Sequence, residues 1–476
     1  MSFLRDTVKS AGAGLVMTVT RFFAMAIIAR KLGVEGFCVL SFSVFCLDLI
    51  ALFALAGLPG LTSRFSSLAS MSERPGFQRF VSLWLAGSIG IVLVSAPVVA
   101  AYVIGLEDWL LYLFCCWSIL VVLQTAVTAQ MQGAMRFDLL AWGNSAGAAV
   151  LILGAIFFIG ADDPAGAFAV LAATALTQAL PVLLLWSGLA RPAPPRDASD
   201  GLPPRRSIVV YGLNAWVTAL TTALVWGRGE VLVIESMLSP KALGYYGAAM
   251  TLLAMVWRMT QMLQGAVAPH LSNRIKSGGA ELETFVTSIN RLTLAISAGS
   301  ALLLALCGRE LAILVFGEEF RRTGEILAWL APGAATAGIG TVNLAVQYLS
   351  NGRFTRNAVM LAALGLLGGS VLLIDGYGLY GAATMRAAVL IAMSIAMTLW
   401  LIDAGYATLG KRVTVEVLAT IIVVASASLL SLSTELPFLA RGMLWFVMTY
   451  LIFGRATGSF VPTRMIRGGV RLLRAL

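Results

Sequence analysis

The stretch AGAGLVMTVTRFFAMAIIARKL, residues 11–32, is apolar along most of its length but carries Arg21 near its centre. As a helix it would be about 33 Å long, enough to cross a hydrocarbon core of about 30 Å. An arginine at the bilayer centre costs roughly 2.5–3.5 kcal/mol, so such arginines face water or a protein interior. Arg258 lies equally deep in the apolar run 243–268. We expect both to face a hydrated interior that receives an anion; snorkelling or local pairing is the alternative.

Composition indicates a membrane protein over the whole chain. The sequence is 59% hydrophobic and 12% charged, with a mean hydropathy of +0.89, values far from those of a soluble domain. Apolar runs of about 20 residues recur from end to end. We predict an all-α polytopic membrane protein with about fourteen transmembrane helices, at residues 11–32, 37–59, 80–104, 109–131, 139–160, 166–189, 208–234, 243–268, 289–307, 326–349, 358–374, 379–402, 415–432 and 437–455.

The distribution of Lys and Arg predicts the orientation. Most of the 33 basic residues fall in the termini and in the connections on the same side, whereas the opposite connections are short and acidic, as at Glu107-Asp108 and Asp162-Asp163. The positive-inside rule therefore places both termini in the cytoplasm. The net charge of +10 reflects this topology and attraction to anionic membrane lipid, not nucleic-acid binding. Residues 464–476 resemble an interfacial amphipathic helix.

A weak internal duplication organises the chain. Gln130 and Gln347 each precede Arg-Phe by the same spacing, at an offset of 217, and two Gly-containing pairs recur at offsets of 215 and 208. Six helices per repeat would insert both repeats in the same orientation, with a substrate site between them. The predicted parts are a six-helix bundle (1–190), a Pro-rich charged cytoplasmic linker (191–207), a second six-helix bundle (208–402), two extra helices (403–455) and a basic amphipathic cytoplasmic tail (456–476).

Several short motifs resemble those of the polysaccharide or O-antigen flippases of the multidrug/oligosaccharidyl-lipid/polysaccharide exporter superfamily. The motifs are ARKLGVEGF (29–37), GRGE (227–230), LGYYGA (243–248), VFGEEF (315–320) and GRF (352–354). The resemblance implies two six-helix bundles, a cationic central cavity and alternating access. It also implies a cargo, an oligosaccharide on undecaprenyl pyrophosphate that is turned from the cytoplasmic to the outer leaflet. Family members often carry an acidic residue early in span seven followed by Arg or Lys, whereas here Arg228 precedes Glu230.

The residues themselves suit such a cargo. A pyrophosphate carries two or three negative charges, and arginine offers a planar fork matched to phosphate oxygens. Arg21, Arg64 and Arg258 are the candidate pyrophosphate ligands, and their positions resemble those of the cavity arginines of the lipid II flippase. Asp48, deep in span two, would neutralise Arg21, hold a coupling proton or bind Na⁺; Glu230 is a second ion-coupling candidate. Candidate sugar ligands are Asn214, Thr218, Gln261, Asn343 and Gln347, although polar residues also hold membrane helices together.

No metal site and no catalytic residues are predicted, and no cofactor beyond coupling to H⁺ or Na⁺. The five cysteines all lie in apolar segments, and His270 is the sole histidine. Expected partners are the lipid-linked oligosaccharide, membrane lipid, and a polymerase with chain-length or export proteins. The expected location is the bacterial inner membrane. Arg386 and Arg441 lie near the outer ends of their spans, where we expect them to snorkel.

Two other function classes are open. The chain would instead flip lipid II or export drugs by cation coupling, although drug exporters favour acidic cavities and twelve spans. Alternatively it would be a membrane glycosyltransferase or polymerase acting on the same lipid. Such an enzyme needs carboxylates or histidine on a long outer loop, and the outer connections here are short. The parallel duplication favours a transporter.

Overall fold

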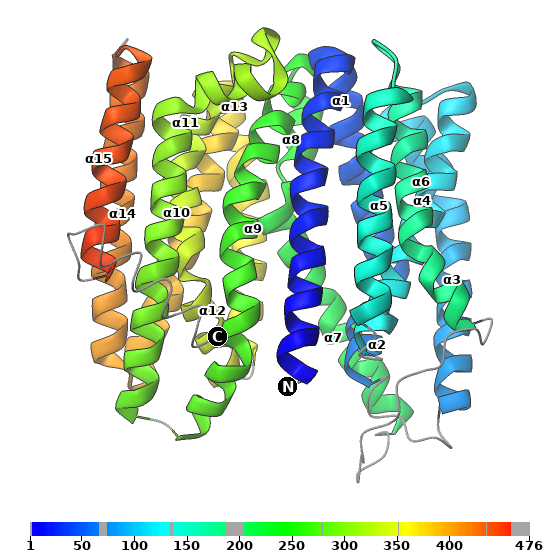
Figure 1. Ribbon diagram of the computed structural model, residues 1–476, viewed down its shortest axis with the longest axis horizontal. Helices are drawn as coiled ribbons and strands as arrows, with labels where there is room; N and C mark the ends of the chain where they lie inside the picture. Colours follow the sequence, from blue (N-terminus) through cyan, green and yellow to red (C-terminus); the bar gives the residue numbers. More distant parts are fainter. Residues whose placement is uncertain are drawn as a thin grey trace. The chain divides into compact units, whose positions relative to one another are not determined.

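A computed structural model describes residues 2–65, 74–133, 137–186, 204–277, 279–350, 352–434 and 436–457. In these ranges the chain is almost wholly helical and contains no strand (Figure 1). The fourteen predicted spans fall on helices, apart from short turns and the residues outside the described ranges. The prediction of an all-α polytopic membrane protein is therefore confirmed.

The chain divides into two compact units, Met1–Val231 and Leu232–Leu476. The predicted duplication and its five-part division stay predictions. Most of the predicted linker 191–207 and tail 456–476 lies outside the described residues. The helices of the first unit are α1 (Ser2–Leu55), α2 (Leu58–Phe65), α3 (Arg74–Val98), the π-helical η1 (Val99–Ile104), α4 (Asp108–Gly133), α5 (Phe137–Phe157), α6 (Pro164–Trp186), α7 (Arg205–Thr222) and the π-helical η2 (Ala223–Arg228).

The second unit begins at Leu232, the second residue of α8. Its long helices include α9 and α10, and α11 is continued by a short 3₁₀ turn into α12, so these two form one predicted span. Its elements are α8 (Val231–Met237), α9 (Pro240–Ser277), α10 (Gly279–Phe316), η3 (Glu318–Phe320), α11 (Thr323–Ala335), η4 (Thr336–Ile339), α12 (Gly340–Leu349), α13 (Arg353–Asp403), α14 (Ala407–Ser433) and α15 (Phe438–Thr457).

Two of the longest helices are each two spans joined at a glycine. In α1, Gly33 has a φ of 63° and a ψ of −173°, and in α13, Gly378 has a φ of 56° and a ψ of −135°. A positive φ with such a ψ is open essentially to glycine alone. Nine helices of the described residues are long and apolar enough to cross a membrane, and these two account for two spans each. Helices α9, α11–α12 and α15 supply the remaining spans.

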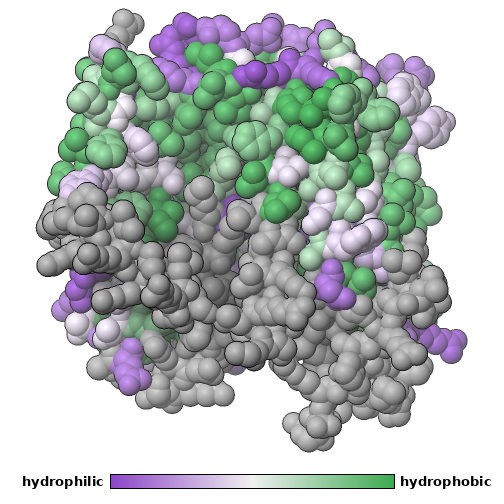
Figure 2. Space-filling view, in the orientation of Figure 1, coloured by the Kyte–Doolittle hydropathy of each residue, from purple (hydrophilic) through white to green (hydrophobic). Residues whose placement is uncertain are grey.

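The outer surface of the described residues is the one a bilayer requires. Large apolar side chains are widely exposed, for example Leu361 at 72% and Leu372 at 77% on α13. Figure 2 shows hydrophobic residues over the middle of the described face and hydrophilic residues gathered at its upper rim. Exposed leucines on this scale would be a liability in water but match the hydrocarbon of a membrane.

Small residues allow the helices of the first unit to pack closely. A Cβ added to Gly154 of α5 would lie 2.6 Å from Val170 of α6, and one added to Gly147 would lie 2.6 Å from Gln178. The Gln178 side chain accepts a hydrogen bond from Gln124 of α4. Close contacts at glycines and hydrogen bonds between side-chain amides commonly hold membrane helices together. Gln178 therefore contributes to helix packing in this structure.

Replacing Gly33 by alanine would test the glycine break in α1. We expect Gly33→Ala to destabilise the protein by about 1–3 kcal/mol, because a Cβ is strained at this φ and ψ. Gly87→Ala in α3 is the matched control, since a Cβ there has nothing within 4 Å, and alanine gains about 0.5–1 kcal/mol in a helix. Thermal unfolding in detergent measures both. Equal melting temperatures for the two variants would show that the break does not need glycine.

Candidate functional site

The break at Gly33 brings Arg21 and Asp48 to the same depth. Arg21 lies twelve residues before Gly33 and Asp48 fifteen residues after it, which is roughly 18 and 22 Å of helix on either side. Asp48 lies within the range of direct charge attraction from Arg21. Neutralisation of Arg21 by Asp48, one of the roles considered from the sequence, is compatible with this attraction and stays a prediction.

A second cation acts on the same carboxylate. Asp48 is also attracted by Arg228, at the end of the π-helical segment η2. Inside this segment Gly227 leaves the helical region, with a φ of −77° and a ψ of −117°. Single π-helical turns are rare and occur frequently at functional sites. We call Arg21, Asp48 and Arg228 the charged cluster of the first unit; it combines two positive charges with one negative charge.

Aromatic and glycine contacts pack α7, which precedes Arg228 along the chain, against the second half of α1 and the start of α2. The indole N–H of Trp216 donates to the carbonyl of Leu52, at 3.0 Å. The Trp216 ring also meets Phe53 edge to face at 5.8 Å. At Gly57, whose φ is +85°, an added Cβ would come within 1.9 Å of the carbonyl oxygen of Gly212. Helix α7 therefore packs against the second half of α1. Just before α2, the backbones at Gly57 and Gly212 are so close that only glycine fits at position 57.

Arg21 and Asp48 are both exposed; the neighbours of Asp48 along α1 are largely buried, whereas Val19 and Phe23 beside Arg21 are exposed. An ionised group at mid-span is strongly disfavoured against hydrocarbon. Their exposure is therefore compatible with a polar or hydrated surface and not with a lipid-facing one. Arg64 is on α2, but its side chain lies outside the described residues. Glu230, the other acidic candidate of the first unit, is fully buried just before α8.

The second unit carries a comparable group on α9. Arg258 and Gln261, three residues apart on one helix face, are both exposed. Helix α9 packs against α12, which carries Asn343, half-buried, and Gln347, exposed. These four predicted ligands thus lie on two neighbouring helices of the same unit. Arg21 and Arg258 belong to different units, so their convergence on one ligand stays a prediction.

Arg386 overturns one expectation. It does not snorkel: its side chain is 0% exposed, and its guanidinium lies over the ring of Trp257 at 5.0 Å from the centroid. Trp257 directly precedes Arg258 on α9, so the buried guanidinium of Arg386 lies against the helical turn that carries Arg258. The one signal in the sequence was an arginine inside an apolar span, which by default marks a functional or structural site.

Arg441 also does not snorkel. It forms an ion pair with Glu310 of α10, and one of its N–H groups donates to the carbonyl of Leu306 at 3.3 Å. This pair joins α15 to α10 inside the second unit. The expectation failed because proximity to a span end was taken as sufficient, whereas a carboxylate on a packed helix offers a closer partner than water does.

The predicted sugar ligands of α7 have different environments. Asn214 is exposed, whereas the Thr218 hydroxyl donates to the carbonyl of Asn214 at 3.0 Å. Such a bond to the preceding helical turn satisfies the hydroxyl proton within its own helix. Asn214 is therefore the freer of the two to meet a ligand. Among the described residues no group of His, Cys, Asp and Glu has metal-binding geometry.

Comparison with known proteins identifies a family that the sequence matches and solved structures with a similar fold. Residues 3–274 match the family model described as "Polysaccharide biosynthesis protein". No curated protein sequence matches the chain. An inward-facing multidrug resistance MATE family transporter of the MOP superfamily has a similar structure, with 14% identity, 84% of this chain and 95% of that chain covered, and a TM-score of 0.61.

Two further solved structures are similar. The lipid II flippase MurJ, in an inward closed conformation, has 13% identity, with 94% of this chain and 98% of that chain covered and a TM-score of 0.54. The eukaryotic MATE transporter AtDTX14 has 14% identity, with 88% and 100% covered and a TM-score of 0.55. At these identities the likeness shows the fold.

The fold and the charged residues within its spans define a multi-pass helical membrane protein with the fold of MOP-superfamily transporters. Because the family model covers more than half of the chain, the chain belongs to the polysaccharide biosynthesis protein family. The family and the fold together support a flippase or an exporter.

A double-mutant cycle would test the charged cluster. Asp48→Asn removes the attraction to Arg21 and Arg228, so we expect a lower unfolding free energy. Adding Arg21→Gln should cost less than the sum of the single changes, with a coupling of about 0.5–3 kcal/mol. Asp48→Asn combined with Arg79→Gln, an exposed residue of α3, should be additive. Equal coupling in both pairs would contradict the cluster.

Arg386→Lys would test the buried cation. Lysine keeps the charge but lacks the planar group that lies over Trp257, so we expect a loss of about 1–2 kcal/mol in unfolding free energy. Arg353→Lys, at an exposed position of α13, should change stability by less than about 0.5 kcal/mol. Denaturant unfolding followed by tryptophan fluorescence measures both variants, and indistinguishable midpoints would reject the stacking role.

Proposed function

We propose that the protein is a flippase that moves undecaprenyl-pyrophosphate-linked oligosaccharide repeat units across the bacterial inner membrane. Its products would serve exopolysaccharide, O-antigen or capsule biosynthesis. The exposure of two mid-span arginines, Arg21 and Arg258, carries this proposal. Because lipid cannot solvate a guanidinium, each exposed arginine argues for a hydrated surface that an anionic headgroup visits.

The chemistry of the headgroup matches these cations. A pyrophosphate brings two or three negative charges into a region of low dielectric constant, where several charge-assisted hydrogen bonds are needed to offset desolvation. Arg21 and Arg258 would bind the pyrophosphate at mid-depth, and Arg64 would attract it at the cytoplasmic entrance. The polyprenyl tail would stay in the surrounding lipid, because its transfer out of hydrocarbon offers no gain.

Exposed amides would hold the sugars. Asn214, Gln261 and Gln347 are exposed on α7, α9 and α12, and an amide can donate to one hydroxyl while accepting from another. Thr218 and Asn343 would play smaller parts, since the Thr218 hydroxyl already donates to its own helix and Asn343 is half-buried. This division supports weak, adaptable binding suited to a cargo that must be released.

The charged cluster supplies a route for ion coupling. With Asp48 ionised, Arg21 and Arg228 share its negative charge. Uptake of H⁺ or Na⁺ by Asp48 would cancel that attraction and free Arg21 for the pyrophosphate; the buried Glu230 is the second candidate for this role. Transport would proceed by alternating access with both termini in the cytoplasm. A polymerase and chain-length or export proteins would consume the product.

Lipid II is the second candidate cargo, favoured by the similarity of fold to the lipid II flippase over 94% of this chain. It has the same polyprenyl pyrophosphate, so the arginines alone do not separate the two. Cation-coupled drug export is favoured less, because a cationic drug would be repelled by exposed arginines at mid-span.

Complementation of a flippase-null strain would test the proposal. We expect Arg21→Ala and Arg258→Ala to lower polymer at matched membrane levels by about 10- to 100-fold, since a charge-assisted hydrogen bond contributes about 1.5–3 kcal/mol. Lipid-linked oligosaccharide should build up on the cytoplasmic side. Arg21→Lys should retain part of the activity, because it keeps the charge but not the fork.

Arg79→Ala, at an exposed position of α3, is the matched control and should make normal polymer. Normal polymer from both Arg21→Ala and Arg258→Ala would refute anion capture by these residues. A wild-type protein that restores no polymer but rescues a strain lacking its lipid II flippase would transfer the proposal to lipid II.

A further inference from the structure

A small cavity lies between α10, α14 and α15 of the second unit, apart from every residue assigned to the cargo. Its volume is about 170 Å³. One end is lined by the charged side chains Arg291 and Glu416. The rest is lined by Thr420 and by apolar residues that include Leu294, Val423 and Ile452. A phospholipid likewise has a charged headgroup at one end and apolar chains along the rest of its length.

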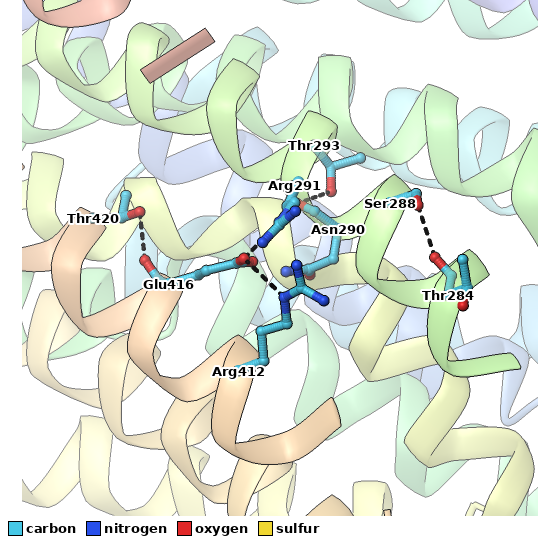
Figure 3. Close-up of polar contacts among 8 residues, drawn as sticks. All are labelled: Thr284, Ser288, Asn290, Arg291, Thr293, Arg412, Glu416 and Thr420. Atoms are coloured by element: carbon cyan, nitrogen blue, oxygen red, sulfur yellow. Dashed lines mark hydrogen bonds and ion pairs between the residues drawn. The ribbon is translucent and has the colours of Figure 1, made fainter. Parts of the chain in front are cut away.

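Two arginines converge on one carboxylate at the charged end (Figure 3). Arg291 Nε of α10 donates to Glu416 Oε1 of α14 at 2.6 Å, and Arg412 Nε approaches the same oxygen at 3.8 Å. The side chains of Arg291 and Arg412 are still 35% and 51% exposed. The group therefore has a net charge of +1 and presents guanidinium N–H groups outward, which a single phosphodiester charge would balance.

Buried polar atoms next to this group lack partners. Asn290, which precedes Arg291 on α10, is 0% exposed, and neither its Nδ2 nor its Oδ1 has a hydrogen-bond partner among the described residues. The same holds for Glu416 Oε2. Unmet polar groups in a protein interior are uncommon and call for an explanation such as a missing ligand.

The depth of the cavity matches a lipid. Arg291 and Glu416 lie within two residues of the predicted cytoplasmic ends of spans 289–307 and 415–432, at the level of lipid headgroups. The apolar lining continues up α14 from Glu416 to Val423, about 10 Å along the helix and toward the bilayer core. Basic pockets between transmembrane helices on the cytoplasmic side are suited to anionic lipid headgroups.

We propose that this cavity binds one anionic phospholipid of the bilayer. Its phosphodiester lies against Arg291 and Arg412, and one acyl chain follows the apolar cavity between α10, α14 and α15. A zwitterionic phospholipid also carries a phosphodiester, but its cationic group would be repelled by the net positive charge of the site. The bound lipid joins the two C-terminal helices to α10, and the site is independent of the proposed transport cargo.

Native mass spectrometry of the purified full-length protein would test this site. The protein would be exchanged into detergent with equal amounts of phosphatidylglycerol and phosphatidylcholine. We expect one retained phosphatidylglycerol per protein, with at least tenfold lower occupancy in the Arg291→Gln/Arg412→Gln variant. Arg353→Gln, exposed at the cytoplasmic start of α13, should retain the lipid as wild type does.

Ala419→Leu, in the apolar lining, leaves every charge in place and should lower phosphatidylglycerol occupancy several-fold by filling the acyl-chain space. All variants must show the wild-type size-exclusion profile. Equal retention of phosphatidylcholine, or full retention by the double variant, would overturn the site. Displacement of phosphatidylglycerol by an equimolar amount of glycerophosphate, or wild-type occupancy in Ala419→Leu, would show a phosphate site without a lipid chain and would equally overturn it.

Discussion

The cost of placing a charge in hydrocarbon shapes this structure more than any other interaction. Charged residues inside the described spans avoid that cost in three different ways. Arg441 pairs with Glu310, Arg386 is buried over Trp257, and Arg21 and Asp48 are exposed on neighbouring halves of α1. The first two ways produce rigid contacts within a unit. The third leaves charged groups accessible, and accessible cations at mid-depth are what an anionic cargo requires.

Polar residues without charge divide in a similar way. In the second unit, Ser297 and Thr293 of α10 donate to the carbonyls of Ala335 and Gly338, at 2.7 and 2.5 Å. These bonds satisfy the backbone where α11 gives way to the 3₁₀ turn η4, so the span can bend without leaving buried carbonyls unpaired. The hydroxyls are therefore part of the packing, whereas the exposed amides of α9 and α12 remain available to a ligand.

The sequence was sufficient to predict the spans, because length and hydropathy are local properties that a bilayer selects directly. It was also sufficient to single out Arg21 and Asp48, because each is a charged residue deep inside an apolar run. It was not sufficient for Arg386 and Arg441. Their partners Trp257 and Glu310 are more than a hundred residues away along the chain, and the face that each helix turns toward its neighbour depends on packing.

The π-helical segment η2 has a consequence for span seven as a whole. Each extra residue held in a π turn rotates everything after it by about 100° around the helix axis relative to a regular α-helix. Counting by α-helical periodicity from Asn214 across η2 therefore assigns Arg228 the wrong face. A one-residue deletion between Ala223 and Gly227 would restore α-helical phase, and Arg228 would turn away from Asp48 without any change in its identity.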